Sequence, residues 1–512
     1  MTWQRLALLA LVLTVGMSGM AVEMAGSRLL APYFGDSNLV WANLIGLILL
    51  YLTVGYYVGG WLADRMPRPA VLFRLTAAAA LAIALIPVAS RPVLRYAVTG
   101  FAAARWGLVI SSFLGVMLLF AVPMILLGCV SPFAIRLSVR GLHATGRVAG
   151  SIYGISTIGS LLGTFLPVFV LIPSLGTRRT FLLTALALSV ISLWGLLQAL
   201  GRRGWLYALI PLLTLLLWVW GTGGAIRPAA GLIYEGESAY NYIQVLQQGE
   251  EFILKLNEGE GNQSVYHPDR ILLSRIFDYF LAAPYFRPAD APFTLGRVCL
   301  IGLAGGTMAR QYAAIYGPVP IDGVEIDPDI ITVAQRYLDL NVPSLEITIG
   351  DGRYFLQHTD RRYDVIIVDA YRPPYIPFHL TTAEFFAEAR DHLAPYGVVA
   401  VNVARTADDF TLVDALASTL HAVFPSVWIV DAAESHNSMI VATATPVSAA
   451  DLQQQSARAE HPLLAEVLAR TAAHLRPFTS ATMPPLRDDR APIERLIHEM
   501  IWRFAWQSEN LS

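Results

Sequence analysis

The sequence predicts a multi-pass α-helical membrane domain followed by an α/β domain with a parallel, doubly wound sheet. The first observation is composition: the 512 residues are 55% hydrophobic and 14% charged, and near-continuous apolar segments fill residues 1–222. The second is pattern: from residue 232 onward, short apolar strands alternate with helical segments, as in a parallel sheet covered by helices.

A chain of this length exceeds one ordinary domain. The expected parts are a transmembrane bundle at 1–222, a linker at 223–231, a β-meander with a lead-in helix at 232–290, a nucleoside-binding domain at 291–445 and a helical tail at 446–512. The formal net charge of −2 does not indicate nucleic-acid binding. Cys129 and Cys299 both lie in apolar runs, so neither a disulfide framework nor a cysteine metal site is expected.

Seven apolar segments approach the roughly 20 residues needed to cross the hydrocarbon layer of a membrane. They lie near residues 6–24, 39–62, 70–88, 107–127, 150–172, 180–199 and 205–222. Several carry glycines four residues apart, which allows helices to approach closely and predicts a packed bundle. These pairs are Gly55 with Gly59, Gly150 with Gly154, and Gly159 with Gly163.

Glu23 and Arg28 are unusual charges at the end of the first segment. An acidic side chain inside a membrane is a functional candidate by default. The alternative is that Glu23 and Arg28 lie at the membrane interface, where they are paired or solvated. Arginines are spread almost evenly over alternate loops, so the positive-inside rule assigns no orientation. Use of an intracellular nucleoside would place the soluble part in the cytoplasm, attached to the cell membrane.

The centre of the soluble part is the stretch 298–327. A short apolar strand is broken by Gly302, Gly305 and Gly306, a helix follows, and a second strand ends in Glu325. Glycines in such a turn let the backbone approach a ligand, and a carboxylate about 20 residues later suits a ribose diol. This order is typical of a nucleoside-binding, Rossmann-like unit, and the alternative is a tight turn that only packs a helix on the sheet.

Further strands are expected at 345–349, 363–370 and 397–403, with strands near Val427 and Met439 closing the sheet. Residues 232–256 alternate in the strand period and turn at Gln248-Gly249, which predicts the meander. Ligands of parallel sheets bind at the carboxyl ends of the strands. The glycine turn, Glu325, Asp351 and Asp369 all fall there, so they are predicted to surround one ligand.

These residues resemble the spermidine synthase (polyamine aminopropyltransferase) family over roughly residues 235–445, and the whole chain resembles its membrane-fused branch. The shared motifs are ESAYNYIQV, LNEGEGNQS, IGLAGGT, VEID, GDG, YDVIIVDA and IPFHLTTAEFF. The resemblance implies a class I methyltransferase-like fold and a homodimer. It also implies transfer of an aminopropyl group from decarboxylated S-adenosylmethionine to a small amine such as putrescine, without a metal.

By the same resemblance, Gln263 contacts the tail of the donor, Glu325 its ribose, and Asp351 with Gly352 its adenine. Asp369 is the catalytic acid that orients and deprotonates the attacking amine. Because an amine must be neutral to attack, a carboxylate beside the sulfonium carbon is a suitable base. A helix cap or a loop salt bridge is the alternative for Asp369.

The acceptor side is less clearly marked. Asp278 matches a supporting glutamate of the family or is a surface acid. Tyr371 and Tyr375 are candidates to stack on an acceptor cation or to pack on the fold. Tyr240 is placed on the meander, where packing is the alternative to contact with the substrate. The histidines show no metal-ligand spacing, so no metal is expected.

Two departures from the family pattern open other functions. Ala304 stands where the glycine turn of the family carries an aspartate that pairs with the amine of the donor, and Arg372 stands where a second acid is expected. Loss of the aspartate relaxes selection for the decarboxylated donor, so methyl or aminocarboxypropyl transfer from S-adenosylmethionine is a second hypothesis. A polyamine transporter or sensor with a non-catalytic ligand domain, using Glu23 and the bundle in the lipid, is a third.

Overall fold

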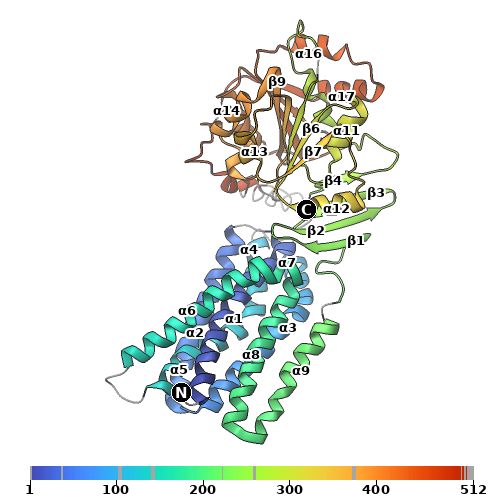
Figure 1. Ribbon diagram of the computed structural model, residues 1–512. Helices are drawn as coiled ribbons and strands as arrows, with labels where there is room; N and C mark the ends of the chain where they lie inside the picture. Colours follow the sequence, from blue (N-terminus) through green and yellow to red (C-terminus); the bar gives the residue numbers. More distant parts are fainter. Residues whose placement is uncertain are drawn as a thin grey trace. The chain divides into compact units, whose positions relative to one another are not determined.

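The computed structural model describes residues 3–35, 38–101, 107–139, 145–221, 223–257, 261–293, 295–371, 376–481, 483–497, 499–500 and 503. The chain divides into two compact units (Figure 1). The helical unit contains residues 1–229 and 235–242, and the α/β unit contains residues 230–234 and 243–512. The strand that crosses this boundary, β1 (Leu232–Glu237), contributes residues to both units.

Long apolar helices make up the helical unit. They are α1 (Trp3–Phe34), α2 (Asn38–Arg65), α3 (Pro69–Phe101), α4 (Gly107–Gly128), α6 (Thr145–Leu166) and α8 (Thr177–Leu200). Shorter segments complete the unit: α5 (Val130–Ser138), the π-helical η2 (Pro167–Leu171), α7 (Ile172–Leu175), the 3₁₀ segment η3 (Gly201–Ala208), α9 (Leu209–Leu216) and η4 (Leu217–Gly221). Within the described residues, six helical stretches are long and apolar enough to cross a membrane.

The last of these six helices contains the sixth and seventh segments expected from the sequence. It runs from Thr177 to Gly221 over 45 residues, more than twice the roughly 20 residues that a crossing requires. The chain reverses in η3, so that α8 and α9 lie side by side (Figure 1). Gly204 permits this reversal, because a Cβ atom there would lie 2.8 Å from the carbonyl oxygen of Leu196.

Glycines bring helices into backbone contact at two of the three expected pairs. A Cβ atom at Gly55 would lie 2.3 Å from the carbonyl oxygen of Ile125, and one at Gly163 would lie 2.1 Å from that of Met17. These approaches join α2 to α4 and α1 to α6. Gly150 and Gly154 do not take part, because a Cβ atom at either position would meet open space among the described residues.

A small antiparallel sheet precedes the nucleoside-binding fold. Its strands lie in the order β1, β2 (Tyr242–Gln248), β3 (Glu251–Leu256) and β4 (Ser264–Tyr266). The turn between β2 and β3 consists of Gly249 and Glu250, one residue beyond the predicted Gln248-Gly249, and Gly249 has a φ of +61°. The expected lead-in helix is short, because only α10 (Ile276–Tyr279) and the 3₁₀ segment η5 (Phe280–Tyr285) form there.

The second sheet has eight strands in the order β12-β10-β11-β9-β8-β5-β6-β7. Their bounds are β5 (Val298–Ile301), β6 (Ile321–Glu325), β7 (Leu345–Ile349), β8 (Tyr363–Val368), β9 (Leu393–Ala404), β10 (Ser426–Asp431), β11 (Asn437–Thr443) and β12 (Leu475–Phe478). The helices of this fold are α11 (Thr307–Tyr316), α12 (Pro328–Tyr337), α13 (Gly352–His358), η6 (Phe378–Leu380), α14 (Ala383–Asp391) and α15 (Thr411–His421). Strands β5 to β9 are parallel, as predicted, and β10 to β12 are antiparallel, so the sheet is mixed.

The C-terminal segment is not the purely helical tail that we expected. Helices α16 (Ala449–Ser456) and α17 (Pro462–Ala473) are followed by β12, which pairs with β10 at the edge of the sheet. The capping box of Ser448 and Asp451 starts α16. The tail therefore completes the α/β unit.

Candidate active site

The carboxyl ends of neighbouring parallel strands meet at one edge of the large sheet. Ile301 of β5 is in register with Val324 of β6 and with Val368 of β8. The next residues along these three strands are Gly302, Glu325 and Asp369. Asp351 follows β7, whose last residue, Ile349, is in register with Glu325. The four positions singled out in the sequence thus share this edge, and their roles toward a ligand stay predictions.

The glycine turn is shaped by close backbone approach. Gly302 has a φ of +90°, and a Cβ atom there would lie 2.3 Å from the carbonyl oxygen of Asp369. Gly306 has a φ of +75°, and a Cβ atom there would lie 2.2 Å from the Leu340 side chain. Only glycine combines these backbone angles with these contacts at low cost. The turn therefore ties the first strand directly to the segment that carries Asp369.

The amides of this turn bond within the protein. The N–H of Ala304 donates to Oε2 of Glu325 over 2.9 Å, and the N–H of Gly305 donates to Oγ of Ser264 over 2.8 Å. Ala304 has a φ of +47°, which places a non-glycine residue in the left-handed region. The turn is thus locked onto Glu325 on one side and onto β4 on the other.

Glu325 is held at the end of β6 with its carboxylate against the glycine turn. It is 7% exposed and also accepts the N–H of Asp327 over 3.1 Å. Burial raises the pKa of Glu325, and the hydrogen bonds from the backbone of Ala304 and Asp327 oppose that rise. Each carboxylate oxygen can accept a second hydrogen bond, as recognition of ribose hydroxyls would require.

Asp351 combines a structural bond with a second one that the sequence did not indicate. Oδ1 accepts the backbone N–H groups of Arg353 and Tyr354 and caps α13. Oδ2 lies 2.8 Å from Nε2 of His379, and this hydrogen bond lowers the pKa of Asp351. Gly352 follows directly, and a Cβ atom there would lie 2.2 Å from the Ile301 side chain. Asp351 is therefore ionised and fixed in orientation.

Asp369 is the carboxyl group with the chemistry of a base. Its side chain is half-buried and accepts a hydrogen bond of 2.7 Å from Nδ2 of Asn402 on β9. Burial raises the pKa of Asp369 to about 7, and the bond from Asn402 acts in the opposite direction. Asn437 in turn donates to Oδ1 of Asn402 over 3.0 Å, which orients that amide. A carboxyl group with this pKa exchanges protons readily at neutral pH.

The segment after Asp369 is described only in part. The hydroxyl of Tyr371 donates to the carbonyl of Asn402 and accepts the N–H of Ala404 over 2.7 Å. Burial raises the pKa of Tyr371, and its ring packs against the core of the sheet. The structure thus favours the packing alternative for Tyr371. Arg372 and Tyr375 lie outside the described residues.

Asp278 is buried, which excludes the surface acid and favours the alternative of a supporting residue. It is 0% exposed and accepts the N–H of Ser274 over 2.8 Å and Nε2 of Gln311 over 2.7 Å. Arg470 of α17 adds an ion pair at 3.5 Å. Because buried carboxylates require such donors, Asp278 joins α10, α11 and α17 and has a structural role.

Other predicted residues have separate places. Gln263 immediately precedes Ser264, the residue that holds the glycine turn, and its own N–H donates to the carbonyl of Leu254 over 2.9 Å. Tyr240 is 43% exposed in the turn between β1 and β2, in the helical unit, and not on a strand face. Also in that unit, Glu23 is half-buried on α1, and Arg28 donates to the carbonyl of Ala239.

Among the described residues, one group of side chains has ligand atoms close enough for a metal ion. Glu250, His267 and Asp269 have ligand atoms within 4.8 Å of one another. Nδ1 of His267 accepts the N–H of Asp269, which leaves Nε2 to donate toward Glu250 at 3.5 Å. These two contacts orient the imidazole between Glu250 and the backbone of Asp269.

Comparison with known proteins assigns the family. The Spermine/spermidine synthase domain family matches residues 296–432, which include the glycine turn, Glu325, Asp351 and Asp369. The polyamine aminopropyltransferase of Vibrio vulnificus (strain CMCP6) is 30% identical over 239 residues, which cover 44% of this chain and 77% of that protein. The chain belongs to the polyamine aminopropyltransferase family.

Two further proteins resemble this chain over part of its length. The probable polyamine aminopropyl transferase of Bifidobacterium longum (strain NCC 2705) is 40% identical over 194 residues, which cover 38% of this chain and 42% of that protein. The match therefore spans less than half the length of that relative. The crystal structure of spermidine synthase from Thermotoga maritima is 20% identical with a TM-score of 0.39, over 49% of this chain and 84% of that one.

Three residues of the site were missed by sequence reasoning. Asn402 is polar within the apolar run GVVAVNV, and a polar side chain on a buried strand is a signal that was available. Ser264 and His379 carried no such signal, because each reaches its partner through a contact between distant parts of the chain.

Proposed function

We propose that this protein is a membrane-anchored transferase that moves an aminopropyl group from decarboxylated S-adenosylmethionine to a polyamine such as putrescine. The observation that carries the proposal is Asp369, a half-buried carboxyl group with a pKa of about 7 beside the glycine turn. Family membership supports the reaction class.

The donor site follows from the residues at the strand ends. Glu325 would accept the ribose hydroxyls, and Asp351 with Gly352 would border the adenine. Gln263, on the segment that leads into β4, would contact the tail of the donor. In this arrangement the sulfonium carbon would lie near Asp369, which shares the strand-end edge with the glycine turn.

The transfer step requires a neutral amine. Asp369 takes the proton from the acceptor ammonium, and the free amine nitrogen attacks the carbon next to the sulfonium. A nitrogen–carbon bond forms, the carbon–sulfur bond breaks, and its electron pair neutralises the sulfonium as methylthioadenosine leaves. The negative charge of ionised Asp369 also attracts the cationic acceptor.

A second function is favoured by one residue. Ala304 stands in the glycine turn with an apolar side chain and its N–H bonded to Glu325, so it offers no carboxylate to the amine of the donor. A donor that keeps its own carboxylate then meets no acidic residue at this position. The alternative is methyl or aminocarboxypropyl transfer from S-adenosylmethionine, and thermal shifts with the two donors distinguish it from the first proposal.

The six apolar helices support a position in the cell membrane, and use of a cytoplasmic nucleoside supports a cytoplasmic α/β unit. The experiment that tests the function is turnover of decarboxylated S-adenosylmethionine and putrescine by the full-length protein. We expect methylthioadenosine to form, and the Asp369→Asn variant to lose about 10²–10⁴-fold in rate while still binding the donor. Unchanged turnover in this variant would contradict the assignment.

A further inference from the structure

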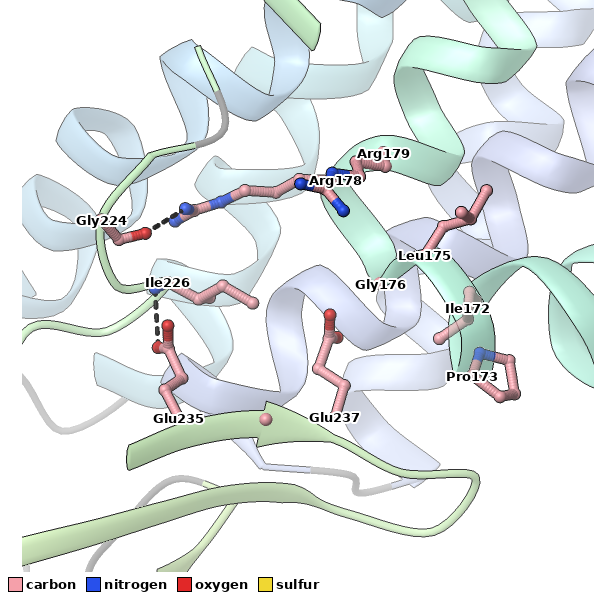
Figure 2. Close-up of a pocket in the computed structure, with 11 residues that line it drawn as sticks. Ile172, Pro173, Leu175, Gly176, Arg178, Arg179, Gly224, Ile226, Glu235 and Glu237 are labelled. Carbon is pink, nitrogen blue, oxygen red and sulfur yellow. Dashed lines mark hydrogen bonds between the residues drawn. The ribbon is translucent and has the colours of Figure 1, made fainter. Parts of the chain in front are cut away.

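A small cavity lies within the helical unit, where one candidate span ends and the next begins (Figure 2). Its volume is about 260 Å³, and its walls come from α7, the first turn of α8, the linker at Gly224 and Ile226, and β1. All of these residues belong to the helical unit. Pockets for drug-sized ligands measure about 300–1,000 Å³, so the occupant of this cavity is a smaller molecule.

One wall of the cavity is negative. Glu235 and Glu237 alternate along β1 and point to the same side of the strand (Figure 2). Glu237 accepts two hydrogen bonds from Thr177, one from the backbone N–H over 2.8 Å and one from the side-chain hydroxyl over 2.5 Å. Glu235 accepts the N–H of Ile226 over 2.7 Å. These donors are neutral, and burial raises the pKa of Glu237. A cation in the cavity would stabilise both charges.

The opposite wall is positive. Arg178 is 6% exposed and donates to the carbonyl oxygens of Gly224 over 2.7 Å and Ala225 over 3.0 Å. Its Nε has no hydrogen-bond partner in the described part of the chain. Arg91 also donates to Gly224, so two guanidinium groups meet at one carbonyl. The exposed Arg179 lines the cavity as well, with its guanidinium 6.0 Å from the Trp218 ring centroid.

Charges of opposite sign thus line one cavity while they bond to neutral groups. A simple cation would be repelled by the arginines, and a simple anion would be repelled by the glutamates. We propose that this cavity binds a small zwitterion, with a primary ammonium at Glu235 and Glu237 and a phosphate at Arg178 and Arg179. Guanidinium groups match the geometry of phosphate oxygens, and primary ammonium groups donate to carboxylates.

This chemistry is that of phosphoethanolamine, either free or as the headgroup of phosphatidylethanolamine. The cavity adjoins the ends of the spans Thr145–Leu175 and Thr177–Gly221, which is the level at which lipid headgroups lie. The proposal does not rest on the proposed transferase function.

Native mass spectrometry of the full-length protein tests the site by titration with phosphatidylethanolamine, phosphatidylcholine or phosphatidylglycerol. We expect a Kd about tenfold lower for phosphatidylethanolamine, because the quaternary ammonium of phosphatidylcholine cannot donate a hydrogen bond and phosphatidylglycerol lacks an ammonium. Equal binding of phosphatidylcholine, or tighter binding of phosphatidylglycerol, together with no stabilisation by O-phosphoethanolamine would overturn the proposal.

Two variants test whether the phospholipids bind in this cavity. Glu237→Gln removes one charge with little change in shape, and Arg179→Gln changes an exposed side chain that does not threaten folding. Glu237→Gln is expected to reduce the preference for phosphatidylethanolamine by about tenfold, because it removes an acceptor for the ammonium. Arg179→Gln is expected to weaken binding of all three lipids by about tenfold, because each of them carries the phosphate. Asp64→Asn is the matched control, because that carboxylate pairs with Arg136 at 3.1 Å and does not line the cavity. An unchanged preference in Glu237→Gln, unchanged affinities in Arg179→Gln, or either loss in the control would contradict the site.

Unfolding measurements in nanodiscs of phosphatidylcholine distinguish a soluble zwitterion from a lipid headgroup. A rise in the unfolding temperature on addition of O-phosphoethanolamine indicates a soluble ligand. A rise that occurs only when phosphatidylethanolamine is in the bilayer indicates a lipid. Both outcomes support the site, and no stabilisation by either compound overturns it.

Discussion

At the scale of single residues, the proposed chemistry depends on the protonation of Asp369. Its carboxyl group is surrounded by protein on most sides, and this burial raises its pKa to about 7. The amide of Asn402 limits the rise, because it donates to the ionised form. Asp369 is therefore partly ionised at neutral pH. Asn402, which positions it, can be substituted without changing Asp369 itself.

The pH dependence of turnover follows from this pKa. Below about pH 7, Asp369 holds its proton and cannot accept another, so the rate is expected to rise as pH increases through about 7. Values of kcat/KM across this range, which report groups of the free enzyme, provide the measurement. A rate that stays constant between acid and neutral pH would show that Asp369 is not the base.

Asn402→Ala removes the hydrogen bond that lowers the pKa of Asp369. We expect the inflection of the pH–rate profile to move to higher pH, with donor affinity unchanged. Asn437→Ala is the matched control, because Asn437 contacts Asn402 and not Asp369, and its effect should be smaller. Equal shifts in the two variants would argue against a direct role of Asn402.

At the scale of elements, glycines determine how closely segments approach. Gly302 joins β5 to the end of β8, and Gly163 joins α6 to α1. Each contact is between backbones, so a side chain at either position has no room to rotate away. Glycines elsewhere in the same units face open space and provide controls.

Gly302→Ala is expected to destabilise the α/β unit by about 3 kcal/mol and to displace Asp369, because it combines a left-handed backbone with a steric clash. Gly317→Ala has a similar φ of +77° and would meet nothing within 4 Å of the described residues. Gly317→Ala should lower the free energy of unfolding by about 1–2 kcal/mol and leave turnover unchanged. Chemical denaturation and rate measurements compare the two, and equal losses of activity would contradict the link to Asp369.

In the helical unit, Gly163→Leu should force α6 away from α1 and lower the free energy of unfolding by about 1–3 kcal/mol or more. Gly154→Leu lies on the same helix, where a Cβ atom meets open space, and should be nearly neutral. Unfolding temperatures in detergent give the comparison. A larger effect at Gly154 would mean that this face is covered in the folded protein.

At the scale of the whole molecule, periodicity predicted the membrane part, the meander and strands β5 to β9 because each forms from a local pattern. The strand ends then followed from the rule for parallel sheets, which placed Glu325, Asp351 and Asp369 at one edge. The partners of these residues were harder to predict, since His379 reaches Asp351 from η6 and Asn402 reaches Asp369 from the neighbouring strand β9. The choice between the two alternatives for Asp278 could not be made from the sequence for the same reason, because its donors come from Gln311 and Arg470, far along the chain.

The identity of the transferred group separates the two proposed reactions, and a competition between the two donors determines it. The full-length protein is incubated with putrescine and equal amounts of S-adenosylmethionine and its decarboxylated form, and the amine products are identified by mass spectrometry. We expect spermidine as the product, with loss of product in Asp369→Asn. A methylated or aminocarboxypropylated amine, or no amine product from either donor, would contradict this expectation.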